Sequence, residues 1–131
     1  MIGYVLLGTN DNDRANAFYD KLFAVTGSKR VMEFPGCTVW GRDAESAPHL
    51  GVTTPYNQER ATAGNGTMVA LHVDSRALVD AIHAKAISLG GQDEGAPGVR
   101  GDEGPGAFYA AYFRDPDGNK LCAFRIGGAV G

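Results

Sequence analysis

The sequence predicts an α+β fold of two tandem modules, each with one β-strand, one α-helix and three further β-strands. Three observations lead to this prediction: a strand pattern followed by a helix pattern near the N-terminus, the return of that pattern 64 residues later, and short strand patterns after each helix. With 131 residues the chain is most simply one domain, which buries roughly two-thirds of its unfolded surface. We place module one at about residues 1–62 and module two at about residues 63–131.

Module one begins with residues 4–10, whose Val, Leu and Thr content is typical of a strand. The polar residues 10–13 offer several helix N-caps, and Gly27 stands where the helix would end. Between these signals the apolar residues recur at helical spacing, at Ala15, Phe18, Tyr19, Leu22 and Phe23. Three short strands are expected next, at residues 29–34, 37–41 and 49–54.

Module two repeats this order. Residues 68–74 are typical of a strand, and Asp74 or Ser75 can cap the helix that follows. The apolar stripe of this helix consists of Leu78, Ile82, Ala86 and Leu89. The remaining strands are expected at residues 108–114, at residues 120–125 and, as one short strand, within the glycine-rich residues 90–106.

The composition argues against several classes of protein. A net charge of −3 with scattered basic residues gives no electrostatic footprint for nucleic acid. No apolar run approaches the roughly 20 residues of a membrane span, and the N-terminus lacks the basic start of a signal peptide. Cys37 and Cys122 form neither a disulfide framework nor a metal-like spacing. We therefore expect a cytoplasmic protein with reduced thiols and no nucleic-acid or membrane partner.

Residues 113–124, FRDPDGNKLCAF, are the most informative stretch. Pro116 suits the first corner of a type I turn, and Gly118 suits the left-handed position after it. The segment resembles the closing hairpin of the glyoxalase/bleomycin-resistance/extradiol-dioxygenase group, the vicinal oxygen chelate superfamily, and the module order extends this resemblance over nearly the whole chain. The resemblance implies sheets that curl around a cup, with the helices outside. An unrelated α+β domain of ferredoxin-like type is the alternative.

Strand alternation converts this fold into a set of side chains that face the cup. The candidate ligand-pocket residues are Tyr4, His49, Met68, His72, Tyr112, Arg114, Cys122 and Phe124. Tyr112 also matches a position that looks out over the ligand in related phosphonate-modifying members. Arg114 is either a cationic anchor for the ligand, or turns to solvent, or pairs with Asp115 or Asp117.

The resemblance also places four metal-ligand positions, at Tyr4, Gly51, Met68 and Cys122. Superfamily enzymes usually carry His, Glu or Gln there, which suit Mn, Fe, Ni or Zn. A phenol, a missing side chain, a thioether and a thiol do not suit a hard divalent ion, so we expect no metal and no cofactor. A divalent ion would need displaced ligands such as His49 and His72.

The cysteines and the glycine-rich segment each allow two interpretations. Cys122 with His72 would form a nucleophile–base pair, or Cys122, like Cys37, is a small buried hydrophobe. His83 is expected on the helix surface. Residues 90–106 are either a mobile lid, with Arg100 or Glu103 touching the ligand, or an unstructured connection.

The sequence therefore predicts a glyoxalase/bleomycin-resistance-like protein that binds a small organic molecule in its cup without the usual metal ligands. One alternative is a metal-dependent lyase of the lactoylglutathione lyase kind, or a dioxygenase, using displaced ligands. Another is a drug-sequestering protein of the bleomycin-resistance type, and a third is thiol chemistry at Cys122. Whether the chain is an enzyme stays open. The resemblance implies a homodimer, because members commonly pair their modules across chains.

Overall fold

The computed structural model describes residues 1–128, and within them the two-module order is confirmed. Module one consists of β1 (Tyr4–Gly8), α1 (Asn12–Ala24), β2 (Lys29–Phe34), β3 (Cys37–Gly41) and β4 (His49–Thr53). Module two consists of β5 (Val69–His72), α2 (Arg76–Ser88), β6 (Gln92–Arg100), β7 (Phe108–Arg114) and β8 (Lys120–Ile126). The helices start at Asn12 and Arg76, which are 64 residues apart, as the repeat predicts.

Each helix begins at a polar N-cap. The Asp11 side chain accepts a hydrogen bond from the Arg14 amide at 3.0 Å, and the Ser75 hydroxyl accepts one from the Leu78 amide at 3.2 Å. The apolar stripe of α1 is buried as predicted, whereas α2 buries Val79, Ile82 and Ala86 with Leu78 and Leu89 only half-buried. Among residues 1–128, neither helix has the length and apolar character that crossing a membrane requires.

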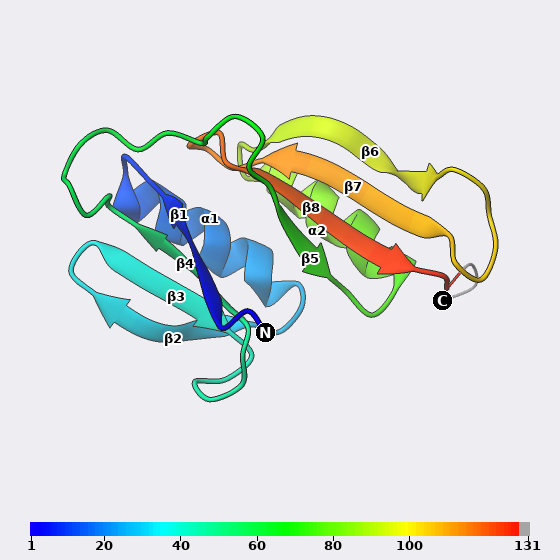
Figure 1. The fold of residues 1–131 in the computed structure, drawn as a ribbon, viewed down its shortest axis with the longest axis horizontal. Helices are drawn as coiled ribbons and strands as arrows, with labels where there is room; N and C mark the ends of the chain where they lie inside the picture. Colours follow the sequence, from blue (N-terminus) through cyan, green and yellow to red (C-terminus); the bar gives the residue numbers. More distant parts are fainter. Residues whose placement is uncertain (129–131) are drawn as a thin grey trace.

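The strands form two separate four-stranded mixed sheets, in the orders β1-β4-β3-β2 and β5-β8-β7-β6. Figure 1 shows both sheets toward the viewer with both helices behind them, and the helices contact each other. One hydrophobic core fills the space between sheets and helices, and Tyr19, Trp40 and Phe113 are its largest fully buried side chains. The α+β fold class is therefore confirmed, but within residues 1–128 of one chain the two sheets do not close around a cup.

β6 is longer than the short strand that we expected. It runs over nine residues at the edge of its sheet, with register shifts between Asp93 and Gly95 and between Gly95 and Gly98. An edge strand with bulges tolerates Pro97, because that residue has no amide hydrogen to donate to a neighbouring strand. The interpretation of this segment as a mobile lid is wrong for residues 92–100, since they belong to the sheet.

The turn between β7 and β8 joins the two modules. Asp117 accepts from the Thr9 hydroxyl at 2.5 Å, and Asp115 accepts from the Tyr19 hydroxyl at 2.6 Å. The Asn119 amide donates to the carbonyl at the end of β1 at 2.9 Å. Gly118 has a φ of +89°, the left-handed position predicted for this turn. The hairpin turn is therefore also the polar contact between the modules.

Candidate functional site

We call the side of the two sheets opposite the helices the open face. It carries the even-numbered residues of β1, β5, β7 and β8, the odd-numbered residues of β3 and β4, and Met32 and Phe34 of β2. The alternate residues, such as Val5 and Leu121, pack in or against the core. The predicted pocket residues therefore share this face: Tyr4, His49, His72, Tyr112, Arg114, Cys122 and Phe124 lie on its strands, and Met68 directly precedes β5.

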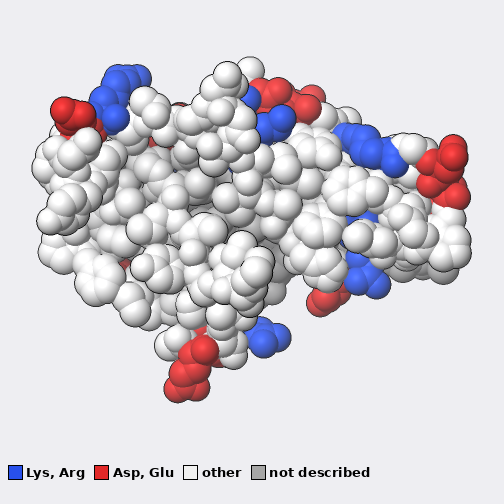
Figure 2. Space-filling model, in the orientation of Figure 1, with Lys and Arg blue, Asp and Glu red and all other residues white. Residues whose placement is uncertain are grey.

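The open face is apolar and largely exposed. Tyr4 is 66% exposed and Phe34 is 55% exposed, although the interior of a protein is the usual place for such large side chains. Leu6, Met32, Met68 and Ile126 are exposed as well. Figure 2 shows this side of the molecule as mostly uncharged atoms over both sheets, with acidic and basic groups gathered toward the rim.

In module one, glycines let other side chains lie flat on the sheet. A Cβ on Gly51 would lie 2.6 Å from Cδ2 of Leu6, and a Cβ on Gly41 would collide with the His49 ring. The His49 Nε2 lies 2.7 Å from the carbonyl oxygen of Asp43 in the loop before β4. Leu6 therefore covers one of the four expected metal-ligand positions, and His49 is held by its own loop.

In module two, aromatic rings cover the end of the sheet farthest from the hairpin turn. The Phe124 ring lies 5.4 Å from His72 in an edge-to-face arrangement and 5.4 Å from Phe108 in a stacked one. His72 is exposed beside this pair. The sequence placed His72 and Phe124 on this face, whereas it did not single out Phe108.

Around Tyr112 the same sheet carries cations. The Arg100 guanidinium carbon lies 5.4 Å from the Tyr112 ring centroid, and the Lys120 Nζ lies 5.6 Å from it. A Cβ on Gly95 would lie 3.1 Å from both Arg100 and Tyr112, so a glycine at this position makes room for their contact. The prediction of a lid assigned Arg100 to a loop and did not see this arrangement.

Arg114 takes a partner that the sequence did not indicate. Its Nε donates to Glu94 Oε1 at 2.6 Å, and its Nη1 donates to the Gly118 carbonyl at 2.8 Å. The alternative in which Arg114 pairs with Asp115 or Asp117 is therefore wrong. The Asp115 carboxylate accepts from Tyr19 and Asn119, and the Asp117 carboxylate accepts from Thr9. Asp117 instead forms an ion pair with Arg14 at 3.0 Å.

Cys122 lies at the centre of the module-two sheet and is fully buried. Burial raises the pKa of its thiol, with the neighbouring Tyr112 opposing that shift, so the thiolate is disfavoured. Among the hydrogen bonds of residues 1–128 none joins Cys122 to His72, since Ala70 rather than His72 is the strand neighbour of Cys122. The geometry therefore gives no support to a nucleophile–base pair.

The four expected metal-ligand positions do not fit a hard divalent ion. They present an exposed phenol at Tyr4, a glycine covered by Leu6, a thioether at Met68 and a thiol at Cys122 that resists ionisation. Within the described part of the chain, no three His, Cys, Asp or Glu side chains come together as a metal site.

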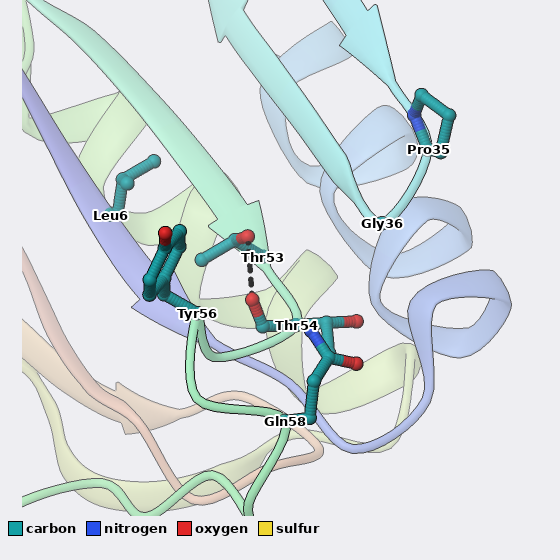
Figure 3. A pocket seen from close by; sticks show the side chains of 7 residues that line it. All are labelled: Leu6, Pro35, Gly36, Thr53, Thr54, Tyr56 and Gln58. Carbon is teal, nitrogen blue, oxygen red and sulfur yellow. Dashed lines mark hydrogen bonds between the residues drawn. The ribbon is translucent and has the colours of Figure 1, made fainter.

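Two hollows adjoin the open face. One of about 550 Å³ lies beside Met68, Arg114 and Lys120 and is bordered by residues 63–67 of the connection between the modules. The other, of about 680 Å³, lies at the end of β1 and β4 beside the fully exposed Tyr56, as Figure 3 shows. Neither hollow was predicted from the sequence, because both depend on how the residues between β4 and β5 fold back on the sheets.

Known proteins resemble this chain over nearly its whole length. The model of the Glyoxalase/Bleomycin resistance protein/Dioxygenase superfamily matches residues 1–123. A glyoxalase/bleomycin resistance protein from Albidiferax ferrireducens is 38% identical, with 95% of this chain and 98% of that chain covered and a TM-score of 0.84. No curated protein matches the chain.

Two more distant structures share the fold. A family enzyme from Burkholderia phytofirmans is 22% identical, with 95% and 97% of the two chains covered and a TM-score of 0.70. A lactoylglutathione lyase from Agrobacterium tumefaciens is 24% identical, with 95% and 92% covered and a TM-score of 0.62. The fold, the hairpin and the family match agree, and the chain belongs to the Glyoxalase/Bleomycin resistance protein/Dioxygenase superfamily.

Proposed function

We propose that this protein binds a small organic molecule on its open face, that a second copy of the chain closes the cup over that molecule, and that no divalent metal takes part. The observation that carries this proposal is the apolar open face of two sheets that one chain leaves unclosed.

The accessible surface of the single chain supports the proposal that another molecule covers the open face. It exposes 7426 Å² at a mass of 13.8 kDa, whereas a compact monomer of that mass exposes about 6600 Å². The excess is accompanied by exposed Tyr4 and Leu6 on β1 and exposed Met32 and Phe34 on β2, the two outer strands of one sheet. Exposed apolar patches of such size mark interaction sites.

A second copy suits this face in size and in charge. With about 3.3 Å per residue and about 4.8 Å between strands, the two sheets span on the order of 750 Å². A standard interface buries about 800 Å² per partner, and a two-fold dimer places the same patch on both sides. Over module one, pairing two such faces would bury few charges, whereas over module two the cations beside Tyr112 lie within the same face.

The middle of the module-two sheet supplies a floor for a ligand. Ala70 is small and exposed, Ala110 and Cys122 beside it are small and buried, and the rings of His72, Tyr112 and Phe124 lie on the same face. Small-molecule sites are typically apolar with a few polar groups, and this sheet offers that combination. The free thiols of Cys37 and Cys122 support residence in the reducing cytoplasm.

Three measurements test the proposal together. Light scattering after gel filtration is expected to give twice the chain mass, and elemental analysis of protein purified without chelators is expected to give no stoichiometric Mn, Fe, Ni or Zn. In NMR titrations with neutral aromatic fragments, we expect saturable shifts at Ala70, Ala110 and Tyr112 and none on the outer side of α2. A stoichiometric ion, a monomer, or shifts away from the open face would each contradict it.

A further inference from the structure

The open face of module two carries a group of cations that module one lacks. Arg100 and Lys120 flank Tyr112, and Arg114 comes from the same strand as that tyrosine. Among residues 1–128, the one carboxylate that pairs with any of the three is Glu94, which binds Arg114. Three cations and one carboxylate leave a local charge of +2, whereas the whole chain carries −3.

Contacts within the chain do not neutralise this charge. Arg100 donates from Nη1 to the Gly98 carbonyl and from Nη2 to the Ala96 carbonyl, both at 2.8 Å, and both acceptors are neutral. Lys120 is half-buried and has no carboxylate within ion-pair distance in the described part of the chain. A second copy over this face would remove water from the Lys120 ammonium, which is costly when no anion lies beside it.

An apolar surface begins next to these cations. Lys120 and Arg114 line the 550 Å³ hollow together with Met68, at the start of β5. From there the sheet continues past Cys122 to the rings of Phe124 and His72. One ligand lying on this sheet would therefore meet positive charge at one end and carbon at the other.

We infer that the ligand of the open face is an organic anion, with a carboxylate or phosphate group at Lys120 and an apolar body over Tyr112, Cys122 and Phe124. This inference rests on the proposed function and names its class of ligand. In module one the open-face positions of β1, β3 and β4 include no Lys or Arg, and the one lysine on that side, Lys29, lies on the outer strand β2 opposite Gly41. The cation group that binds the anion is therefore assigned to module two.

Matched probes separate the anionic group from the apolar body. Benzoate and phenyl phosphate supply the two kinds of anion, and benzyl alcohol supplies the same ring without charge. Calorimetric titration of the wild-type protein is expected to show at least one of the anions binding about 10-fold tighter than benzyl alcohol, since hydrogen bonds to charged groups are the strong ones. The better anion of the two identifies the group that the site takes.

Two variants locate the effect. Lys120→Gln is expected to remove the preference for the anion and to leave benzyl alcohol binding unchanged, whereas Lys85→Gln, an exposed lysine on α2, is expected to keep both. Should Lys120→Gln fail to fold, the wild-type salt dependence replaces it: anion affinity is expected to fall between about 0.05 M and about 0.5 M NaCl while benzyl alcohol affinity stays constant.

The possible failures are distinguishable. Equal affinity for benzoate, phenyl phosphate and benzyl alcohol would overturn the inference about the anion and leave the proposed function standing. An anion preference that survives in Lys120→Gln would overturn the placement at Lys120. No saturable binding of any of the three probes would count against the proposed function itself.

Discussion

Modules one and two have the same order of elements, and their helices start at equivalent positions of the repeat, yet their open faces differ. The face of module one is formed by Tyr4, Leu6 and Phe34 with glycines beneath, and the face of module two has aromatic rings, a buried thiol and three cations. On the helix side, both modules fill one common core. The constraint of a shared core keeps the modules alike on one side, while the open side leaves each free to take a separate role.

If module one mainly supplies contact with a second copy, a charge in its centre has the largest effect. Leu6→Asp would place a carboxylate in the dimer interface without a partner. We therefore expect the dissociation constant of the dimer to rise at least about 100-fold. Sedimentation equilibrium measures this change. Ile87→Asp, a similarly exposed apolar residue on α2, is the matched control and is expected to leave the dimer intact. Equal effects of both variants would contradict the assignment of this face.

The second largest effect concerns the contact between the modules. Asp115 is 4% exposed, and its Oδ2 accepts from the Tyr19 hydroxyl at 2.6 Å and from the Asn119 amide at 2.9 Å. Asp115→Ala would leave these donors buried without an acceptor, and we expect a loss of about 3 kcal/mol in the free energy of unfolding. Urea denaturation measures it, with the exposed Asp13→Ala as control. A loss no larger than that of the control would show that the turn does not hold the modules together.

The same carboxyl group gives a smaller, pH-dependent effect. Burial raises the pKa of Asp115, although hydrogen bonds from Tyr19 and Asn119 oppose the shift. The stability linked to a raised carboxyl pKa is present in full below the ordinary carboxyl pKa and is lost as the pH rises through the raised value. Unfolding free energies of the wild type are therefore expected to fall over that window relative to Asp115→Asn. Parallel pH profiles of the two proteins would contradict this prediction.

The smallest effect concerns the two thiols. In a Cys37→Ser variant the remaining thiol is Cys122, which is buried and whose pKa is raised by that burial. We expect its reaction with a disulfide reagent to be at least about 100-fold slower in the folded protein than in denaturant. Absorbance of the released thiolate measures the rate. Fast labelling of the folded variant would contradict this expectation and would support thiol chemistry at Cys122.

Local patterns predicted most of the fold. The α1 stripe, the N-cap region and the turn at Gly118 depend on residues close together in the sequence, and each was identified. The length of β6 was not, because glycines and Pro97 obscure a strand whose hydrogen bonds come from a neighbouring strand. Predictions from local sequence weaken when cross-strand contacts decide the structure.

The candidate site was predicted in part for the same reason. Alternation along β7 and β8 assigned Tyr112, Arg114 and Cys122 to one face, and the structure places them there. It did not reveal that Glu94 forms an ion pair with Arg114, or that Arg100 of β6 packs over the Tyr112 ring. To predict those contacts one must know the register between strands that are distant in the sequence. To predict that the cup is not closed one must know how the two modules lie relative to each other.

The hydrogen bond from Thr9 to Asp117 spans 108 residues of sequence, and that from Tyr19 to Asp115 spans 96. Ribosomes release the N-terminal part of a chain first, so module one emerges before the turn that completes its polar contacts exists. During that interval the Tyr19 hydroxyl has only water or transient partners, whereas Thr9 has its local partner Asp11, and long-range contacts form late. Newly made protein would therefore depend on the turn between β7 and β8 to complete the polar contacts of module one.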